Sequence, residues 1–205
     1  PITALLPGNL GYADLTRLQM TDVDALFDKI QGTRGLILDM RGYPKGTAWA
    51  IAPRLNVKHA TEVATFYPSI VSGDGSDNMA TSKLVFQQPM PPGNGKPLYR
   101  GKVVMLIDDR AQSQSEHSGL LFESACDTAF IGTPTAGSNG DITNTVLPGG
   151  LTVSFTGQGV EHLDGRQLQR VGLQPKILVS PTLRGLRAGK DEVLDRAVRF
   201  LTQGH

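Results

Sequence analysis

The sequence has 205 residues, of which 39% are hydrophobic and 19% charged, a composition that excludes intrinsic disorder and predicts a globular chain. Basic and acidic residues nearly balance, so the formal net charge of +1 predicts no broad basic surface for nucleic acid. No apolar run approaches the roughly 18 residues that cross a bilayer, so we expect no membrane insertion. The single cysteine, Cys126, excludes an internal disulfide and a multi-cysteine metal site.

Short apolar runs, bounded by glycine or charged residues, recur along the chain. Those that are apolar on both faces predict buried strands at 35–40, 102–107 and 128–132. Residues 151–156 alternate between apolar and polar side chains and predict a half-exposed strand. A last short strand is predicted at 176–179.

Between these runs, apolar residues recur at helical spacing and predict helices at 21–30, 116–126 and 191–201. Strands that alternate with helices predict an α/β fold. The long connection between the first two buried strands contains two polar, turn-rich stretches at 72–78 and 89–97. We interpret that connection as a variable excursion and not as a second domain.

The segment 108–117 follows a predicted buried strand and leads into a predicted amphipathic helix. A serine at this junction, Ser113, is favoured as a nucleophile because the free N–H groups of the first helical turn stabilise developing negative charge. A second interpretation uses the same residues: Ser113 and Glu116 have the spacing of a capping box, which is typical of a helix start without any catalytic role. The local pattern alone favours capping.

Several sequence blocks, in the same order along the chain, resemble those of the C-terminal-processing (tail-specific) serine proteases and the related tricorn core proteases. After a Gly-Tyr strand start within 8–15 come GLILDMRGYPKG at 35–46, QSQSE at 112–116, IGTPTAG at 131–137 and VGLQP at 171–175. The resemblance implies a crotonase-like α/β spiral. It also implies a serine endopeptidase that cleaves unfolded or C-terminal polypeptide segments without a cofactor, and a periplasmic or secreted location.

By this resemblance Ser113 is the nucleophile that forms the acyl-enzyme. The backbone N–H of Gln114 supplies one donor of the oxyanion hole, and the other comes from near Gly46. Ser115 is expected inside the first helical turn, where its hydroxyl is less suited to attack.

The positions that carry the family's other catalytic groups depart from the pattern. Ser138 stands where the processing proteases have a lysine as general base, and Gln169 where the tricorn-like branch has a glutamate. A glutamine can orient an imidazole by a hydrogen bond but stabilises imidazolium less than a carboxylate does. His117, one helical turn after Ser113, is a weaker candidate for the base within this chain.

The histidine of the tricorn-like branch would precede Pro1, and the sequence begins there without an initiator methionine or a signal-peptide pattern. We therefore expect residues 1–205 to be a catalytic domain that forms the C-terminal part of a longer chain, with its base supplied from upstream. The isolated domain is then expected to be nearly inactive.

Two other functions stay open at this point. A non-catalytic protein on the same scaffold would bind a peptide or an apolar ligand, which the missing lysine and glutamate favour and the intact Ser113 block opposes. A crotonase-type acyl-CoA enzyme shares the fold class but fits the blocks at 112–116 and 171–175 poorly.

Other polar residues have structural interpretations. Asp39 and Arg41, at the end of a predicted buried strand, are expected to pair with each other, and His162 is expected in an exposed hairpin turn. No grouping of His, Asp and Glu has metal-ligand spacing, so we expect no metal. No pattern specifies an oligomeric state.

Overall fold

The computed structural model describes residues 1–68 and 85–204, so the loop predicted at 72–78 lies outside the described residues. Its centre is a six-stranded sheet in the order β1-β2-β3-β6-β7-β11, in which only the β1–β2 pair is antiparallel. The strands are β1 (Thr3–Leu6), β2 (Leu10–Asp14), β3 (Gly35–Asp39), β6 (Lys102–Ile107), β7 (Ala129–Gly132) and β11 (Ile177–Leu178). Three of the predicted buried strands are therefore confirmed as β3, β6 and β7.

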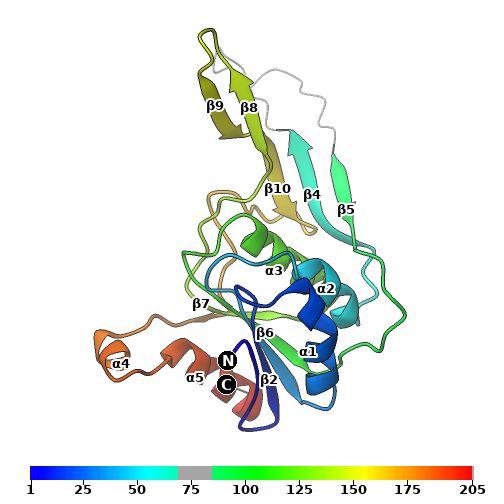
Figure 1. The fold of residues 1–205 in the computed structure, drawn as a ribbon, viewed down its shortest axis with the longest axis vertical. Helices are drawn as coiled ribbons and strands as arrows, with labels where there is room; N and C mark the ends of the chain where they lie inside the picture. The colour runs from blue at the N-terminus through cyan, green and yellow to red at the C-terminus, as the bar shows by residue number, and fades with distance from the viewer. Residues whose placement is uncertain (69–84, 205) are drawn as a thin grey trace.

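Helices cover both faces of this sheet (Figure 1). Leu36 and Leu38 of β3 point into a core shared with α1 (Val23–Ile30), α2 (Ala48–Leu55) and α3 (Gln114–Ala125), whereas Ile37 points into a core shared with α5 (Glu192–Gln203). Successive side chains of a strand point to opposite faces, so an all-apolar strand needs cover on both. The α/β fold predicted from the sequence is confirmed. Short helices η1 (Met20–Asp22) and α4 (Leu183–Arg187) precede α1 and α5.

A second, antiparallel sheet lies beyond α3, in the order β10-β4-β5 (Figure 1). Its strands are β4 (Glu62–Pro68), β5 (Phe86–Pro89) and β10 (Gln158–His162). The connection interpreted as a variable excursion contains α2, β4 and β5 in addition to the loop that follows β5, and no pattern in the sequence predicted these three elements. β4 pairs with β10 across about 90 residues of chain. No local pattern in the sequence predicts a pairing over that distance.

Residues 142–156 form a hairpin of β8 (Ile142–Val146) and β9 (Thr152–Thr156), which projects from the body beside the second sheet (Figure 1). Every residue of both strands is exposed. The expectation of a half-exposed strand at 151–156 is therefore wrong, because β9 pairs with β8 but neither face packs on the core.

An ion-paired cluster joins the end of β3 to the start of α5. Arg41 donates to both carboxylate oxygens of Asp39, at 2.9 and 2.6 Å, and to both of Asp191, at 2.8 and 2.6 Å. The Tyr12 hydroxyl also donates to Asp39, at 2.9 Å, and burial together with that carboxylate raises the pKa of Tyr12. The structural pairing expected of Asp39 and Arg41 is confirmed, and its effect is to tie the sheet to α5.

Candidate active site

Ser113 ends the turn that follows β6 and is the last residue before α3. Its backbone has φ +50° and ψ −113°, a left-handed conformation that glycine adopts freely and serine rarely does. Such a backbone costs about 1–3 kcal/mol and persists only where the surroundings enforce it, which is most often at active sites. A serine that only capped a helix would have no need of this conformation, because N-cap residues ordinarily lie in the β region.

The Glu116 carboxylate is fully buried and holds the turn at Ser113 in place. Its Oε2 accepts the backbone N–H of Ser113 at 3.2 Å and of Ser138 at 2.9 Å. Its Oε1 accepts the N–H of Gly137 at 2.7 Å and the Thr135 hydroxyl at 2.6 Å. The predicted capping interaction from Glu116 to Ser113 is present, and the same carboxylate also binds the 135–138 turn to the start of α3.

A cleft of about 750 Å³ opens in front of Ser113. Ser113 and Gln114 lie in its wall together with His117 of α3, Asn139 after the 135–138 turn, and Gln158 of β10. Further apolar lining comes from α2, β4 and β5, namely Trp49, Phe66, Phe86 and Met90. An apolar cleft with a few polar groups at one end has the form of a ligand-binding site.

His117 is buried in the floor of this cleft between two aromatic rings. Its imidazole stacks on Trp49, with ring centres 5.5 Å apart, and is tilted against Phe66 at 5.7 Å. Its Nδ1 lies 3.4 Å from the side-chain amide nitrogen of Asn139. Burial disfavours the imidazolium and lowers the pKa of His117 to about 4, although the charge of Asp141 opposes the shift. The ring is therefore neutral at pH 7, with a pKa far from the value suited to a general base.

These features can be compared with known proteins. A model of the family described as peptidase family S41 matches residues 9–179. The chain belongs to peptidase family S41. The family resemblance expected from the sequence blocks is therefore confirmed. No curated protein sequence matches the chain significantly.

Solved structures of low sequence identity share the fold of this S41 chain. A Parabacteroides merdae protein described as a candidate peptidase superimposes with a TM-score of 0.81 at 18% identity, over 99% of this chain and 64% of its own. CPAF in complex with lactacystin gives 0.70 at 17% identity, over 96% and 52%. The photosystem II D1 C-terminal processing protease gives 0.60 at 20% identity, over 98% and 49%. This S41 chain thus spans between about half and two thirds of the length of these structures.

Of the other predicted site residues of this S41 chain, Gln114 lines the cleft, whereas Gly46 and Ser115 do not. As the first residue of α3, Gln114 has its N–H in the first turn, where intrahelical acceptors are lacking. Gly46 has φ +75° and precedes α2 in the sequence. The residues Tyr43 and Trp49 on either side of it in the chain line the cleft, whereas Gly46 does not. The Ser115 hydroxyl donates to the Gly42 carbonyl at 2.6 Å, which agrees with its exclusion as nucleophile.

Ser138 and Gln169 lie behind the cleft wall, outside its lining. The Ser138 side chain is exposed, and its backbone N–H is the group bound to Glu116. The side-chain amide of Gln169 donates to the carbonyl of Asn139 at 2.7 Å and to that of Gln158. Within the described residues no hydrogen bond joins Gln169 to a histidine. Because a carboxylate cannot donate to two carbonyls, an ionised acid at 169 could not make these contacts.

Sequence reasoning missed two polar groups of the cleft. The amide oxygens of Gln88, on β5, and Gln158, on β10, are buried and accept no hydrogen bond from any described residue. Buried acceptors normally have a donor, so an acceptor of this kind in a cleft is suited to an N–H group of a ligand. The two residues are 70 positions apart in the sequence, and no motif singles out either one.

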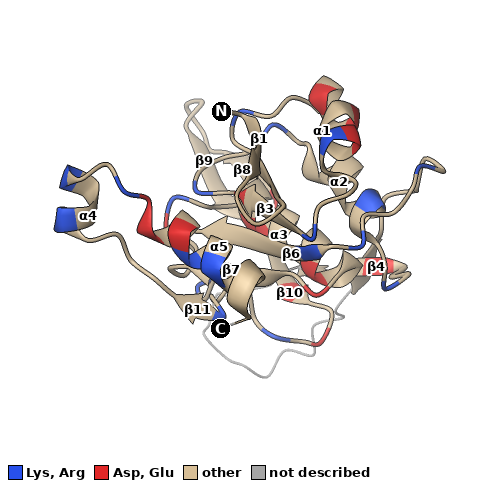
Figure 2. Cartoon of the chain, turned by 90° about the horizontal axis from the view of Figure 1, so that it is seen from below, with Lys and Arg blue, Asp and Glu red and all other residues tan. Residues whose placement is uncertain are grey.

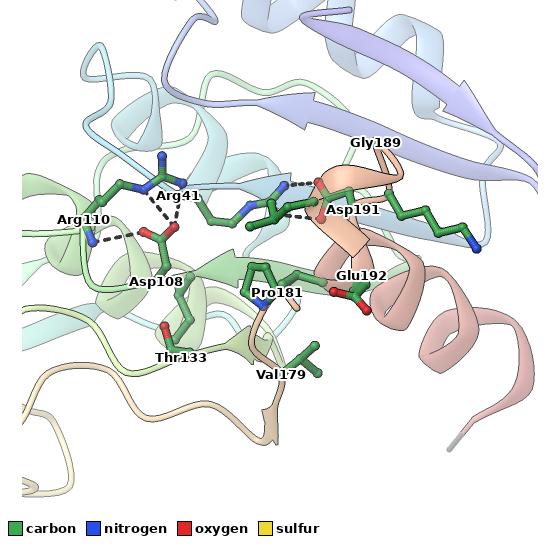
Figure 3. Close-up of a pocket in the computed structure, with 13 residues that line it drawn as sticks. Arg41, Asp108, Arg110, Thr133, Val179, Pro181, Gly189, Asp191 and Glu192 are labelled. Atoms are coloured by element: carbon green, nitrogen blue, oxygen red, sulfur yellow. Dashed lines mark hydrogen bonds and ion pairs between the residues drawn. The ribbon is translucent and has the colours of Figure 1, made fainter. Parts of the chain in front are cut away.

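A separate cavity of about 330 Å³ lies past the carboxyl ends of β3, β6 and β7, against α4 and α5 (Figure 3). Both arginines of its lining are already paired: Arg110 binds Asp108 at 2.6 Å, and Arg41 binds Asp191. Figure 2 shows basic residues on α4 and acidic residues at the start of α5, so residues of both charge signs lie near this cavity.

No three His, Cys, Asp or Glu residues in 1–68 and 85–204 are placed to hold a metal ion. No helix in these ranges is long and apolar enough to cross a membrane.

Proposed function

We propose that this S41 chain is the catalytic domain of a serine endopeptidase that cleaves unfolded or C-terminal polypeptide segments through an acyl-enzyme on Ser113. The observation that carries the proposal is the left-handed backbone of Ser113 at the start of α3, held there by Glu116 and opening onto the cleft. This arrangement presents a hydroxyl to a ligand and places the first N–H groups of a helix beside it.

In the proposed reaction the Ser113 oxygen attacks the carbonyl carbon of the scissile peptide bond and loses its proton to a base. The oxyanion formed in this step accepts hydrogen bonds from the Gln114 N–H and from a second donor near Gly46. The amine leaves with a proton, and water then hydrolyses the ester on Ser113. The low pKa of His117 favours a base from outside residues 1–205, as does the length that the chain lacks relative to the solved structures.

The lining of the cleft supports an extended polypeptide as substrate. Its apolar part suits uncharged side chains, and the amide oxygens of Gln88 and Gln158 suit backbone N–H donors.

The same proposal includes a crotonase-like spiral as the fold and the assignment of residues 1–205 to one catalytic domain. The family resemblance also supports a periplasmic or secreted location, which fractionation of the producing cell would test.

Labelling with a fluorophosphonate probe, located by peptide mass spectrometry, tests the nucleophile. We expect the label on Ser113 in a longer form that includes the upstream region, and much slower labelling of residues 1–205 alone. Ser113→Ala should abolish the label and lower peptide cleavage by at least about 1,000-fold. Ser115→Ala, the matched control two residues away, should keep both. A label that persists in Ser113→Ala would disprove the assignment.

A second candidate function, a non-catalytic peptide- or apolar-ligand-binding protein, is favoured by one observation. Gln169 stands at the position of the family acid and is used as a double donor to backbone carbonyls. If both the long and the short form are folded and neither is labelled, while an extended peptide raises the melting temperature, the scaffold binds without turnover.

A further inference from the structure

The cleft in front of Ser113 carries a single charge. Among the described residues that line it, only Asp141 has a formal charge at pH 7, because the imidazole of His117 is neutral. Asp141 is exposed, and within residues 1–68 and 85–204 no cation forms an ion pair with its carboxylate. A charge without a counterion on the wall of a binding cleft is available to an opposite charge on the ligand.

Hydrogen bonds on both sides of Asp141 hold the wall that carries it. The Gly157 N–H donates to the Asp141 carbonyl at 3.3 Å. The side-chain amide of Gln169 joins the carbonyls of Asn139 and Gln158, which lie on either side of this point. The backbone that presents the carboxylate is therefore fixed before a ligand arrives, which lowers the entropy lost on binding.

Close packing at Gly140, the residue before Asp141, fixes the same wall. Gly140 has φ +135°, and a Cβ atom there would lie 2.5 Å from the Thr156 methyl group. It would also lie 2.9 Å from the Gln158 carbonyl oxygen and 2.9 Å from the Gln169 amide nitrogen. Only glycine fits this position, so the place of Asp141 in the wall depends on it.

The charge of Asp141 acts on the interior of the cleft. It favours the imidazolium form of His117 and so opposes the effect of burial on the pKa of that ring. His117 lies in the floor of the cleft, and an interaction between charges weakens with distance. The Asp141 carboxylate therefore contributes a negative potential at the place where a ligand lies.

The uncharged groups of the cleft favour the same kind of ligand. The amide oxygens of Gln88 and Gln158 are buried acceptors to which no described residue donates. Tyr43 and Phe86 line the cleft and are 51% and 57% exposed, so their rings are accessible to a cation. Ammonium and guanidinium groups only donate hydrogen bonds, whereas a carboxylate only accepts them. The lining thus matches a basic side chain and opposes an acidic one.

We propose that the cleft selects polypeptide segments with an arginine or lysine side chain, which binds Asp141 near the scissile bond, and disfavours an acidic side chain at that place. This inference rests on the proposed function, because the segment belongs to the polypeptide that Ser113 attacks. Asp141 is then a specificity-determining residue, which binds the substrate and takes no part in the transfer of protons.

Binding to Ser113→Ala protein in the longer form measures this selectivity without turnover. The probes are three fluorescein-labelled short peptides, followed by fluorescence anisotropy, which differ only in a central arginine, citrulline or glutamate between apolar residues. Citrulline has nearly the shape of arginine without its charge. We expect the arginine peptide to bind about tenfold more tightly than the citrulline peptide at low salt, and the glutamate peptide to bind most weakly. High salt should reduce these differences.

Two substitutions of Asp141 and one control assign the preference to this carboxylate. Asp141→Asn keeps the size of the side chain and should make binding of the arginine and citrulline peptides equal. Asp141→Lys should reverse the order, so that the glutamate peptide binds more tightly than the arginine peptide. Asp28→Asn removes an exposed carboxylate on α1, outside the cleft, and should leave the preference unchanged.

Equal binding of the arginine and citrulline peptides by the protein with Asp141 would overturn the inference. So would an arginine preference that persists in Asp141→Asn, or an equal loss for all three peptides, since the residue would then only support the wall. Failure of the proposed function has a different signature: no fluorophosphonate label on Ser113 in the longer form, with the Asp141-dependent preference for arginine still observed.

Discussion

Two carboxylate clusters, one buried and one partly exposed, lie near the carboxyl ends of neighbouring strands, and their charges are compensated in different ways. Glu116 accepts four hydrogen bonds from neutral groups, and no cation hydrogen-bonds to it within the described residues. Asp39 and Asp191 instead share the guanidinium of Arg41. A cation beside Glu116 would compete with the backbone donors for its oxygens. The neutral cluster therefore fixes the conformation of a turn, whereas the ionic cluster joins two secondary-structure elements.

The largest effect is expected from breaking the neutral cluster. Glu116→Ala leaves four donors without an acceptor and should lower the free energy of unfolding by about 4 kcal/mol. Glu116→Gln should have about half that effect, because its oxygen still accepts two hydrogen bonds while its NH₂ group faces the other two donors. Urea denaturation measures both. Equal stability of Glu116→Gln and the parent would show that the charge of Glu116 is not needed.

The next largest effect is expected at His117, the residue that follows Glu116, because its buried imidazole is neutral at pH 7. The folded pKa of about 4 lies below the unfolded value of about 6.5, so the unfolded state takes up the proton first. Stability should therefore fall by up to about 3 kcal/mol as the pH drops from 6.5 to 4. His117→Phe should lack this part of the acid sensitivity and keep fluorophosphonate labelling at pH 7 within about threefold.

Denaturation of the two proteins across this pH range measures the difference. Identical slopes would mean that folding does not lower the pKa of His117. A loss of labelling by 100-fold or more in His117→Phe would instead identify this histidine as the general base.

A smaller effect is expected at the ionic cluster, which is partly solvated. Arg41→Met leaves Asp39 and Asp191 without their cation and should cost about 2 kcal/mol at pH 7. Burial alone would raise the pKa of Asp191, but the hydrogen bonds and charge of Arg41 lower it below its usual value. The stability gained from this pair is present above the unfolded pKa and is lost as the pH falls below about 4.

The difference in unfolding free energy between Arg41→Met and the parent should therefore shrink on acidification. Arg17→Met removes the more exposed ion pair with Asp14 and serves as the control, with a much smaller expected change at every pH. A pH-independent effect of Arg41→Met would mean that packing of the arginine stem, and not its charge, joins β3 to α5.

Patterns that are local in the sequence predicted their structures well. Continuous apolar runs became β3, β6 and β7 because burial on both faces needs only the residues of the run itself. The junction at Ser113 was also predictable, since a strand end, a polar turn and a capping box occur within ten residues. Its left-handed backbone was not, because serine is a rare residue in that conformation.

Features that depend on distant pairing could not be predicted in the same way. His162 was expected in an exposed turn but is 4% exposed, because its Nδ1 lies 2.5 Å from Glu123 on α3, 39 positions away. The elements α2 and β5 were not predicted for a different, local reason: α2 contains an internal proline, and β5 is short and largely exposed. The cleft itself is assembled from α2, α3 and the second sheet, so most of its lining carries no motif.

The left-handed backbone of Ser113 has a consequence for how the chain can change over generations. A glycine at 113 would relax the turn, and an alanine would keep the strained backbone without the hydroxyl. The most stable residue at this position is therefore one that cannot act as a nucleophile. Random substitution combined with selection for stability alone would favour glycine, and a serine can be maintained here only while its hydroxyl is useful to the cell.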